Sequence, residues 1–210
     1  MKFAGWGDPG KRFSLEGKPN LWSFIESVTG VADSTPTPPV DFDSITLSEP
    51  RIEETFLLAL TKQLRHDQIA SDRTTRLLHC YGKSYRDLLR AIAGKVERAP
   101  DLVLFPESQE EVVTIVTAAA ASNVKLIPFG GGTNIVGGVE VTPTTRSTVA
   151  TVSLRRMNRV LRIDESSLVA TIEAGALGPE LESDLNAAGY TLGHFPDSFE
   201  FSTLGGWLAT

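Results

Sequence analysis

Apolar residues recur at intervals of three and four along much of the first half of the chain, a spacing that places them on one face of a helix. Segment 21–31 has this pattern and reaches Gly30 near its end, which predicts a short amphipathic helix. Residues 51–97 show the pattern around Phe56 and again around Leu88, so this region is expected to be mainly helical.

About halfway along the chain the pattern changes to short apolar runs of the kind found in buried strands. Residues 101–105 and 125–129 are such runs. Between them, Ser108 and Glu111 match a capping box that opens a helical repeat, and Asn123 is suited to end that helix in a left-handed conformation. A strand, a helix and a strand within about thirty residues predict a parallel pair of strands.

Further runs of alternating or apolar residues predict three more strands, and a helix is expected after them. Residues 147–154 are predicted to form a third strand, and segments 160–164 and 168–175 an antiparallel hairpin. A further helix is expected between Pro179, which suits a first helical turn, and Gly189, which suits a helix end.

These elements predict an α+β protein with two parts. Residues 1–97 are assigned to an N-terminal arm and helical segment, in which the proline-rich stretch 32–44 is expected to be a linker or surface arm. Residues 98–210 are assigned to a domain of two α/β subdomains, a small parallel βαβ part followed by a mixed or antiparallel sheet. The last residues, TLGGWLAT, have a strand-like context with no closing element after them, so this domain is expected to be an incomplete fragment.

Composition narrows the classes of function. The 210 residues carry 20 Lys and Arg against 26 Asp and Glu, a net charge of −6, which argues against a nucleic-acid partner. No apolar run approaches the roughly 20 residues that span a bilayer, so no transmembrane segment is expected. The single cysteine, Cys80, cannot form an internal disulfide, and with only three histidines no metal site is predicted. A reducing compartment, the cytoplasm, follows as the expected location.

The strongest local motif is PFGGGTN, which directly follows a predicted strand. Three consecutive glycines leave backbone N–H groups free to converge on an anion, and the spacing fits neither a Rossmann fingerprint nor a Walker loop. We therefore predict a phosphate-binding loop that is not the start of a helix, with a plain glycine turn as the alternative. The candidate residues are Pro128, Phe129, Gly130, Gly131, Gly132, Thr133 and Asn134.

A second motif lies near the end of the chain, where polar residues alternate with phenylalanines and a glycine pair follows. This arrangement suits hydrogen bonding to a heteroaromatic ring and its phosphates, although a polar turn with a core aromatic pair would look similar. The candidate residues are Asp197, Ser198, Phe199, Glu200, Phe201, Ser202 and Thr203.

Together the two motifs resemble the FAD-binding domain of the vanillyl-alcohol oxidase and p-cresol methylhydroxylase superfamily. Within it the chain is most similar to the alkylglycerone-phosphate synthase family of ether-lipid enzymes. Shorter motifs occur in the order of that family, namely GWG (5–7), RAPD (98–101), MNR (157–159), EAG (173–175) and GYTLGH (189–194). In related hydroxy-acid dehydrogenases an asparagine usually follows the second glycine of the last motif, whereas Trp207 stands here, as in the synthases.

The resemblance implies a non-covalently bound FAD. Residues 128–134 would surround its pyrophosphate, residues 197–203 would line the flavin and ribityl side, and Thr210 would begin a further FAD contact. It implies a transferase that exchanges the acyl chain of acyl-dihydroxyacetone phosphate for a fatty alcohol, with a lipid substrate, a homodimer and peripheral membrane contact as further expectations. The family's catalytic groups match no residue here, so no catalytic residue is assigned.

Two other functions stay open beside this one, an FAD-linked dehydrogenase of a 2-hydroxy acid and an inactive truncated cofactor-binding fragment. Composition favours a bacterial cytoplasm, and a eukaryotic parent would be peroxisomal. Among single residues, His194 is interpreted as a structural or pocket-lining histidine, and His79 and Cys80 as structural. The arginine-rich stretch 65–90 alternates with aspartates and is interpreted as a solvated helix face.

Overall fold

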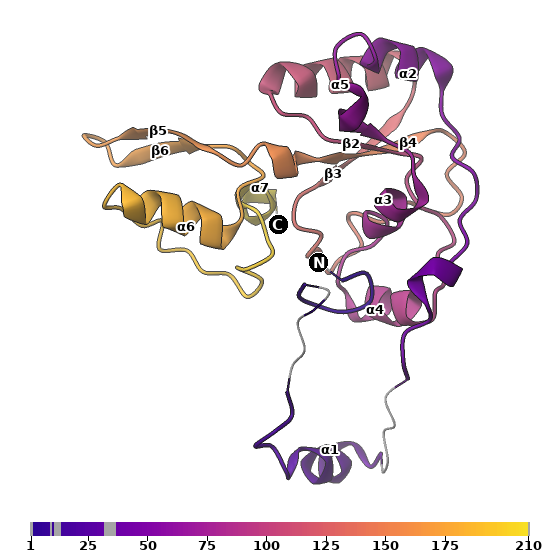
Figure 1. The fold of residues 1–210 in the computed structure, drawn as a ribbon, viewed down its shortest axis with the longest axis vertical. Coiled ribbons are helices and arrows are strands. Elements are labelled where there is room, and N and C mark those ends of the chain that lie inside the picture. The colour runs from indigo at the N-terminus through magenta and orange to yellow at the C-terminus, as the bar shows by residue number, and fades with distance from the viewer. Residues whose placement is uncertain (1, 9, 11–13, 32–36, 210) are drawn as a thin grey trace.

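The computed structural model describes residues 2–8, 10, 14–31 and 37–209. Its elements follow one another along the chain as helices first and mixed strands and helices afterwards (Figure 1). They are α1 (Leu21–Thr29), η1 (Phe42–Ser44), α2 (Glu54–Leu60), η2 (His66–Gln68), β1 (Ile69–Ala70), α3 (Arg73–Leu78), α4 (Tyr85–Ile92), β2 (Leu102–Leu104), α5 (Gln109–Ala121), β3 (Lys125–Phe129), β4 (Val149–Ser153), η3 (Leu154–Arg156), β5 (Val160–Asp164), β6 (Val169–Ile172), α6 (Gly178–Ala187) and α7 (Leu204–Ala209).

The first sheet has the strand order β1-β2-β4-β3. Strands β2 and β3 run parallel, as predicted, but they do not pair, because β4 lies between them and pairs with both. All residues of β4 are buried, whereas Lys125 and Pro128 of β3 are exposed. The two fully buried strands, β2 and β4, therefore occupy the centre, and the strand that carries a proline lies at the edge, where a missing N–H costs least.

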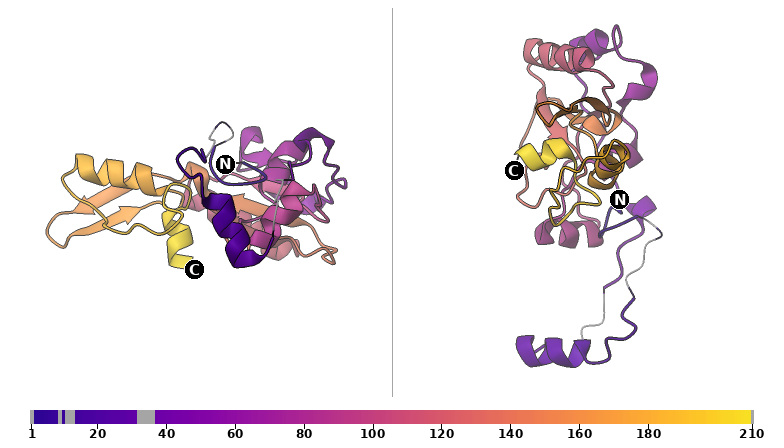
Figure 2. Two further views of the ribbon diagram at one scale, coloured as in Figure 1. Left: turned by 90° about the horizontal axis from the view of Figure 1, so that it is seen from below. Right: turned by 90° about the vertical axis from the view of Figure 1, so that its left-hand side faces the viewer.

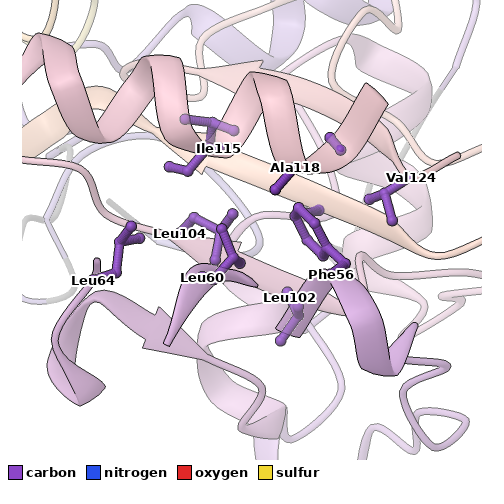
Figure 3. Packing of buried hydrophobic residues seen from close by; sticks show 11 residues of the cluster. Phe56, Leu60, Leu64, Leu102, Leu104, Ile115, Ala118 and Val124 are labelled. Atoms are coloured by element: carbon purple, nitrogen blue, oxygen red, sulfur yellow. The ribbon is translucent and has the colours of Figure 1, made fainter. Parts of the chain in front are cut away.

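The larger core lies between this sheet and two helices on one face, α2 and α5 (Figure 1). Phe56 and Leu60 of α2 are fully buried and point toward Ile115 of α5 and the strand residues Leu102 and Leu104 (Figure 3). Helices α3 and α4 lie on the opposite side of the sheet. The sheet thus has helices on both faces, which suits strands that read as continuous apolar runs.

Helix α5 begins and ends where the sequence predicts. The Ser108 hydroxyl accepts a hydrogen bond from the Glu111 N–H (3.2 Å), and Asn123 has a φ of 53°. The carboxylate half of the predicted capping box is different, because the Glu111 side chain accepts from the Glu107 N–H (2.7 Å) and from the buried Gln68 amide (2.7 Å). The glutamate therefore ties α5 to η2 and does not close the box.

A second, smaller unit extends to one side of the sheet (Figures 1 and 2). It contains the predicted antiparallel hairpin β5–β6, which packs against Leu181 and Leu185 of α6 and against Ala176 just before that helix. The α+β class with a parallel part followed by an antiparallel pair is confirmed. Strand β1 of the first sheet comes from the segment assigned to the N-terminal region, so this segment contributes to the sheet. The domain boundary between residues 97 and 98 stays a prediction.

The strand-like interpretation of the final residues is wrong, since residues Leu204–Ala209 form α7. The extended backbone before this helix reaches Thr203, which forms an antiparallel β-bridge with Leu177. The Thr203 hydroxyl then accepts from the Gly206 N–H (3.4 Å), and its carbonyl accepts from the Trp207 N–H (3.0 Å). Capping by a threonine starts a helix here despite the glycine pair.

The interpretation of stretch 65–90 as a solvated face is also wrong for its central arginines. Arg76 is buried and donates to the carbonyls of Pro100 (2.7 Å) and Ser48 (3.0 Å), while Arg73 donates to the carbonyl of Ile45 (2.8 Å). Buried guanidinium groups need acceptors, and here backbone carbonyls of the segment before α2 supply several of them. The two arginines therefore hold this segment against the body of the protein.

The N-terminal region is less compact than the rest. Helix α1 has no buried residue and lies apart from the body (Figures 1 and 2), and it ends at Gly30 in a left-handed conformation, as predicted. The linker predicted at 32–44 falls partly outside the described residues; within it, 37–41 are exposed and η1 follows. Among the described residues, no helix is long and apolar enough to span a membrane.

Candidate functional site

The glycine-rich loop leaves the carboxyl end of β3 and touches the second motif directly. A Cβ on Gly131 would lie 1.6 Å from the Phe201 carbonyl oxygen, and a Cβ on Gly130 would lie 2.2 Å from the Thr203 hydroxyl. Gly132 has a φ of +71°. The loop therefore needs glycine for two reasons, close approach of another backbone segment and a left-handed conformation.

Asn134 closes the loop from within. Its side-chain oxygen accepts from the N–H groups of Val136 (3.1 Å) and Gly138 (2.8 Å), so this oxygen stabilises the loop and is not directed at a ligand. The Asn134 carbonyl accepts from the Lys83 N–H (2.7 Å), and a Cβ on Gly82 would lie 2.0 Å from that carbonyl oxygen. Backbone contacts on both sides thus fix the loop.

The second motif folds as a series of turns braced by aromatic rings. Phe199 stacks on Trp207 with ring centroids 6.1 Å apart and 19° between the planes, and Phe195 lies 5.0 Å from Phe199. The Trp207 indole N–H donates to the Ser202 hydroxyl (2.6 Å), which donates to the Ser198 carbonyl (2.8 Å). Helix α7 therefore fixes the shape of the segment that precedes it.

These two segments line one cavity of about 1300 Å³. All of residues 128–134 and 197–203 contribute to its wall, so the structure brings the two predicted motifs together, while Thr210 lies outside the described residues. Cavities for drug-sized ligands typically occupy about 300–1000 Å³, so this one has room for a larger ligand such as a dinucleotide. That each residue contacts the ligand remains a prediction.

The wall of the cavity combines glycine backbone, aromatic rings, aliphatic side chains and small polar side chains. Among the described lining residues, none is Lys or Arg, and the acidic groups are Asp197 and Glu200. Negative phosphates placed here would have to be bound by N–H groups of the glycine-rich loop and not by cationic side chains. The arrangement suits a ligand with a planar ring at one end and phosphates at the other.

Several wall residues of the cavity lie outside the two predicted motifs. Trp6 comes from the N-terminal arm, Ala174 from the turn after β6, and Leu154 from η3. The sequence signal for two of them was present, since Trp6 lies in GWG and Ala174 in EAG, but periodicity does not show which distant segments meet. His194 lines the cavity as interpreted, and its ring packs edge-on against Trp207 at 5.3 Å.

His79 and Cys80 are structural in their surroundings. The His79 ring packs 4.6 Å from that of Phe129 and its Nδ1 lies 2.8 Å from the Thr75 carbonyl oxygen, and burial lowers its pKa. Cys80 is fully buried, which raises the pKa of its thiol to about 12. A thiol with so high a pKa is a poor nucleophile at neutral pH.

A helix-covered, mostly parallel sheet, followed by a hairpin unit and a dinucleotide-sized cavity lined by a glycine-rich loop, is the architecture of a flavin-nucleotide-binding domain. The family described as FAD binding domain matches residues 100–210, and the chain belongs to this family. FAD is accordingly the cofactor. The residues present fit it, because the cavity is lined by the backbone of three consecutive glycines, which suits a diphosphate, and by aromatic rings, which suit a planar ring.

Comparison with individual proteins agrees with the assignment to this family. The chain is 40% identical to the alkyldihydroxyacetonephosphate synthase of Dictyostelium discoideum and 39% identical to that of Trypanosoma brucei brucei, in both cases along its full length. It spans only 38% and 37% of those proteins. A solved structure of an alkyldihydroxyacetonephosphate synthase matches with a TM-score of 0.89 at 39% identity, covering 100% of this chain and 43% of that one.

Proposed function

We propose that this chain holds FAD non-covalently in the cavity between residues 128–134 and 197–203. The observation that supports this most directly is the contact between Gly131 and Phe201, which joins two motifs about seventy residues apart into a single wall. In this proposal the N–H groups of the glycine-rich loop bind the diphosphate, and the turns from Asp197 to Thr203 line the flavin and ribityl side.

We propose further that the chain is the FAD-binding part of an alkyldihydroxyacetonephosphate synthase. The full-length similarity to such synthases supports this, and the substrate would be a small lipid, an acyl-dihydroxyacetone phosphate whose acyl chain is exchanged for a fatty alcohol. When bound, the flavin would supply the electrophilic ring at which that exchange takes place. The residues described here bind and orient the cofactor, and none is assigned to the exchange itself.

The aromatic wall contributes in two ways. Phe199 and Trp207 provide a rigid, apolar surface beside which a planar ring is shielded from water. The hydrogen bond from Trp207 to Ser202 holds this surface in place before the ligand arrives, which lowers the entropy cost of binding.

An FAD-linked 2-hydroxy-acid dehydrogenase is the alternative enzyme. Trp207 counts against it, because the hydroxy-acid dehydrogenases usually carry an asparagine at this position. In this chain the Trp207 indole instead stacks on Phe199 and donates to Ser202. The two activities differ in a simple readout, because a 2-hydroxy acid would bleach the flavin of a dehydrogenase and not that of a synthase.

Four narrower features belong to the same proposal: the division into domains, the oligomeric state, membrane contact and the location in the cell. Residues 98–210 would form the cofactor domain and residues 1–97 an N-terminal region packed on it. A homodimer and peripheral contact with a membrane are expected from the family resemblance. A bacterial cytoplasm, or a peroxisome in a eukaryote, is expected from composition and resemblance.

Titration of the purified chain with FAD tests the cofactor site. We expect saturable binding of one FAD per chain, with the shifted visible absorption of a bound flavin, and release of unmodified FAD on denaturation. A chain that is folded by circular dichroism and shows no saturable binding would overturn the proposal. Bleaching of the bound flavin by lactate or glycolate would instead favour the dehydrogenase.

A further inference from the structure

The N-terminal arm reaches the cavity wall from far away in the sequence. Trp6 lines the cavity, and its ring centroid lies 6.3 Å from that of Phe201 with a 50° tilt. In Figures 1 and 2 the N-terminal ribbon lies where the sheet unit and the hairpin unit meet. The arm therefore lies at the junction where the glycine-rich loop and the second motif also meet.

Three sets of contacts define the arm: the first shapes the arm itself, and the other two attach it to the body of the protein. The Lys2 N–H donates to the Gly7 carbonyl (2.8 Å), which closes the arm into a loop around Trp6. Phe3 packs edge-on against Phe42 at 5.5 Å and lies 6.5 Å from the ring of Tyr81. The third set comes from a single lysine of the body.

Lys83 binds the arm and the glycine-rich loop at once. Its ammonium donates to the carbonyls of Lys2 (2.8 Å) and Phe3 (3.0 Å), and its backbone N–H donates to the carbonyl of Asn134 (2.7 Å). Lys83 is only 8% exposed, and burial lowers its pKa to about 8. Because a buried ammonium is costly without acceptors, its two bonds to the arm are strongly favoured over release of the arm.

We propose that Trp6 is an outer wall of the FAD cavity that contacts the bound dinucleotide, and that Lys83 is the positioning residue that holds it there. The inference rests on the proposed FAD site and adds to it a contribution from outside the matched cofactor domain. A rigidly held indole covers a planar or apolar part of the ligand and excludes water from it.

Equilibrium binding of FAD to matched tryptophan variants of the 210-residue chain tests this proposal. Trp6→Ala is expected to raise the dissociation constant about tenfold, and Trp6→Phe to restore most of the affinity. Trp22→Ala is the control, because Trp22 lies on α1, is 48% exposed and does not line the cavity. Equal affinities for wild type and Trp6→Ala would overturn the Trp6 wall and leave the FAD site standing, whereas a wild type that bound no FAD would overturn both.

Tryptophan emission provides a readout that does not depend on affinity. Flavin absorption overlaps tryptophan emission, so FAD at saturation should quench Trp6 strongly. The emission lost on saturation should be smaller in Trp6→Phe than in Trp22→Phe. Equal losses in the two variants would contradict contact between Trp6 and the cofactor.

A double-mutant cycle tests the role of Lys83. Lys83→Met keeps the aliphatic stem and removes the donors, and it is expected to weaken FAD binding about fivefold to tenfold while making the arm more sensitive to protease. In the Trp6→Ala background the same change should cost less than twofold, because the positioned group is already gone. Additive effects, measured on variants with native-like melting curves, would show that Lys83 does not act through Trp6.

Discussion

Gly131 and Phe201 meet so closely that no side chain fits between their backbones: a Cβ on Gly131 would lie 1.6 Å from the Phe201 carbonyl oxygen. The contact fixes the glycine-rich loop against the turns of residues 197–203, and both line the same cavity. It therefore converts two separate sequence motifs into one binding site. Stability and cofactor affinity should both depend on this contact.

Gly131→Ala is expected to lower the melting temperature and to weaken FAD binding more than tenfold. The added methyl must displace backbone, a form of overpacking that typically costs about 1–3 kcal/mol. Gly10→Ala is the matched control, because a Cβ on Gly10 meets nothing within 4 Å. Thermal unfolding with and without FAD measures both effects, and an unchanged affinity in Gly131→Ala would contradict the shared wall.

Trp207→Phe should destabilise the second motif while keeping the fold. The variant keeps a ring to stack on Phe199 but loses the 2.6 Å hydrogen bond to Ser202, which is worth about 0.5–1.5 kcal/mol. Urea denaturation measures the loss, and a weaker FAD complex is expected with it. Ser202→Ala removes the same bond from the other side, so the two changes combined should cost less than the sum of each alone.

The ion pair between Arg98 and Asp101 should be essential for the fold. Both side chains are buried, with contacts of 2.8 and 2.6 Å, and the Asp101 carboxylate also accepts from the N–H groups of Arg51 (2.8 Å) and Val149 (2.9 Å). Asp101→Ala leaves a guanidinium and two N–H groups without acceptors, so we expect a loss of about 3–5 kcal/mol.

An exposed pair is the comparison for that measurement. Glu107 bonds Arg65 (2.7 Å) and Arg156 (2.9 Å) at the surface, and each such surface pair contributes about 0–1 kcal/mol. Glu107→Ala should therefore shift the unfolding midpoint little. Comparable losses in Asp101→Ala and Glu107→Ala would show that burial does not set the energies of these pairs.

Stability should fall as the pH drops below about 6.5, because of His79. Burial lowers the pKa of His79 in the folded protein, so the unfolded chain takes up a proton near pH 6.5 that the folded protein resists. The free energy of unfolding is therefore highest above this pH and declines as the pH falls further, until the folded protein also takes up the proton. His79→Gln should flatten the decline, whereas the exposed His66→Gln should leave it unchanged. A decline of the same slope in both variants would assign it to other groups.

Local chemistry in the sequence determined much of the secondary structure. The cap at Ser108, the left-handed Asn123 and the hairpin of residues 160–172 each depend on neighbours in the chain, and each is found as predicted. The glycine-rich loop was recognised for the same reason, since a need for bare backbone shows directly in the residue types.

Only the tertiary structure decided which distant segments meet. The sequence contains no local sign that β4 lies between β2 and β3, or that Arg76 is buried under backbone carbonyls. Nor does it show that Lys83 brings Trp6 to the cavity wall. Each of these depends on acceptors and surfaces contributed by remote residues, and such pairings exist only after the chain has packed.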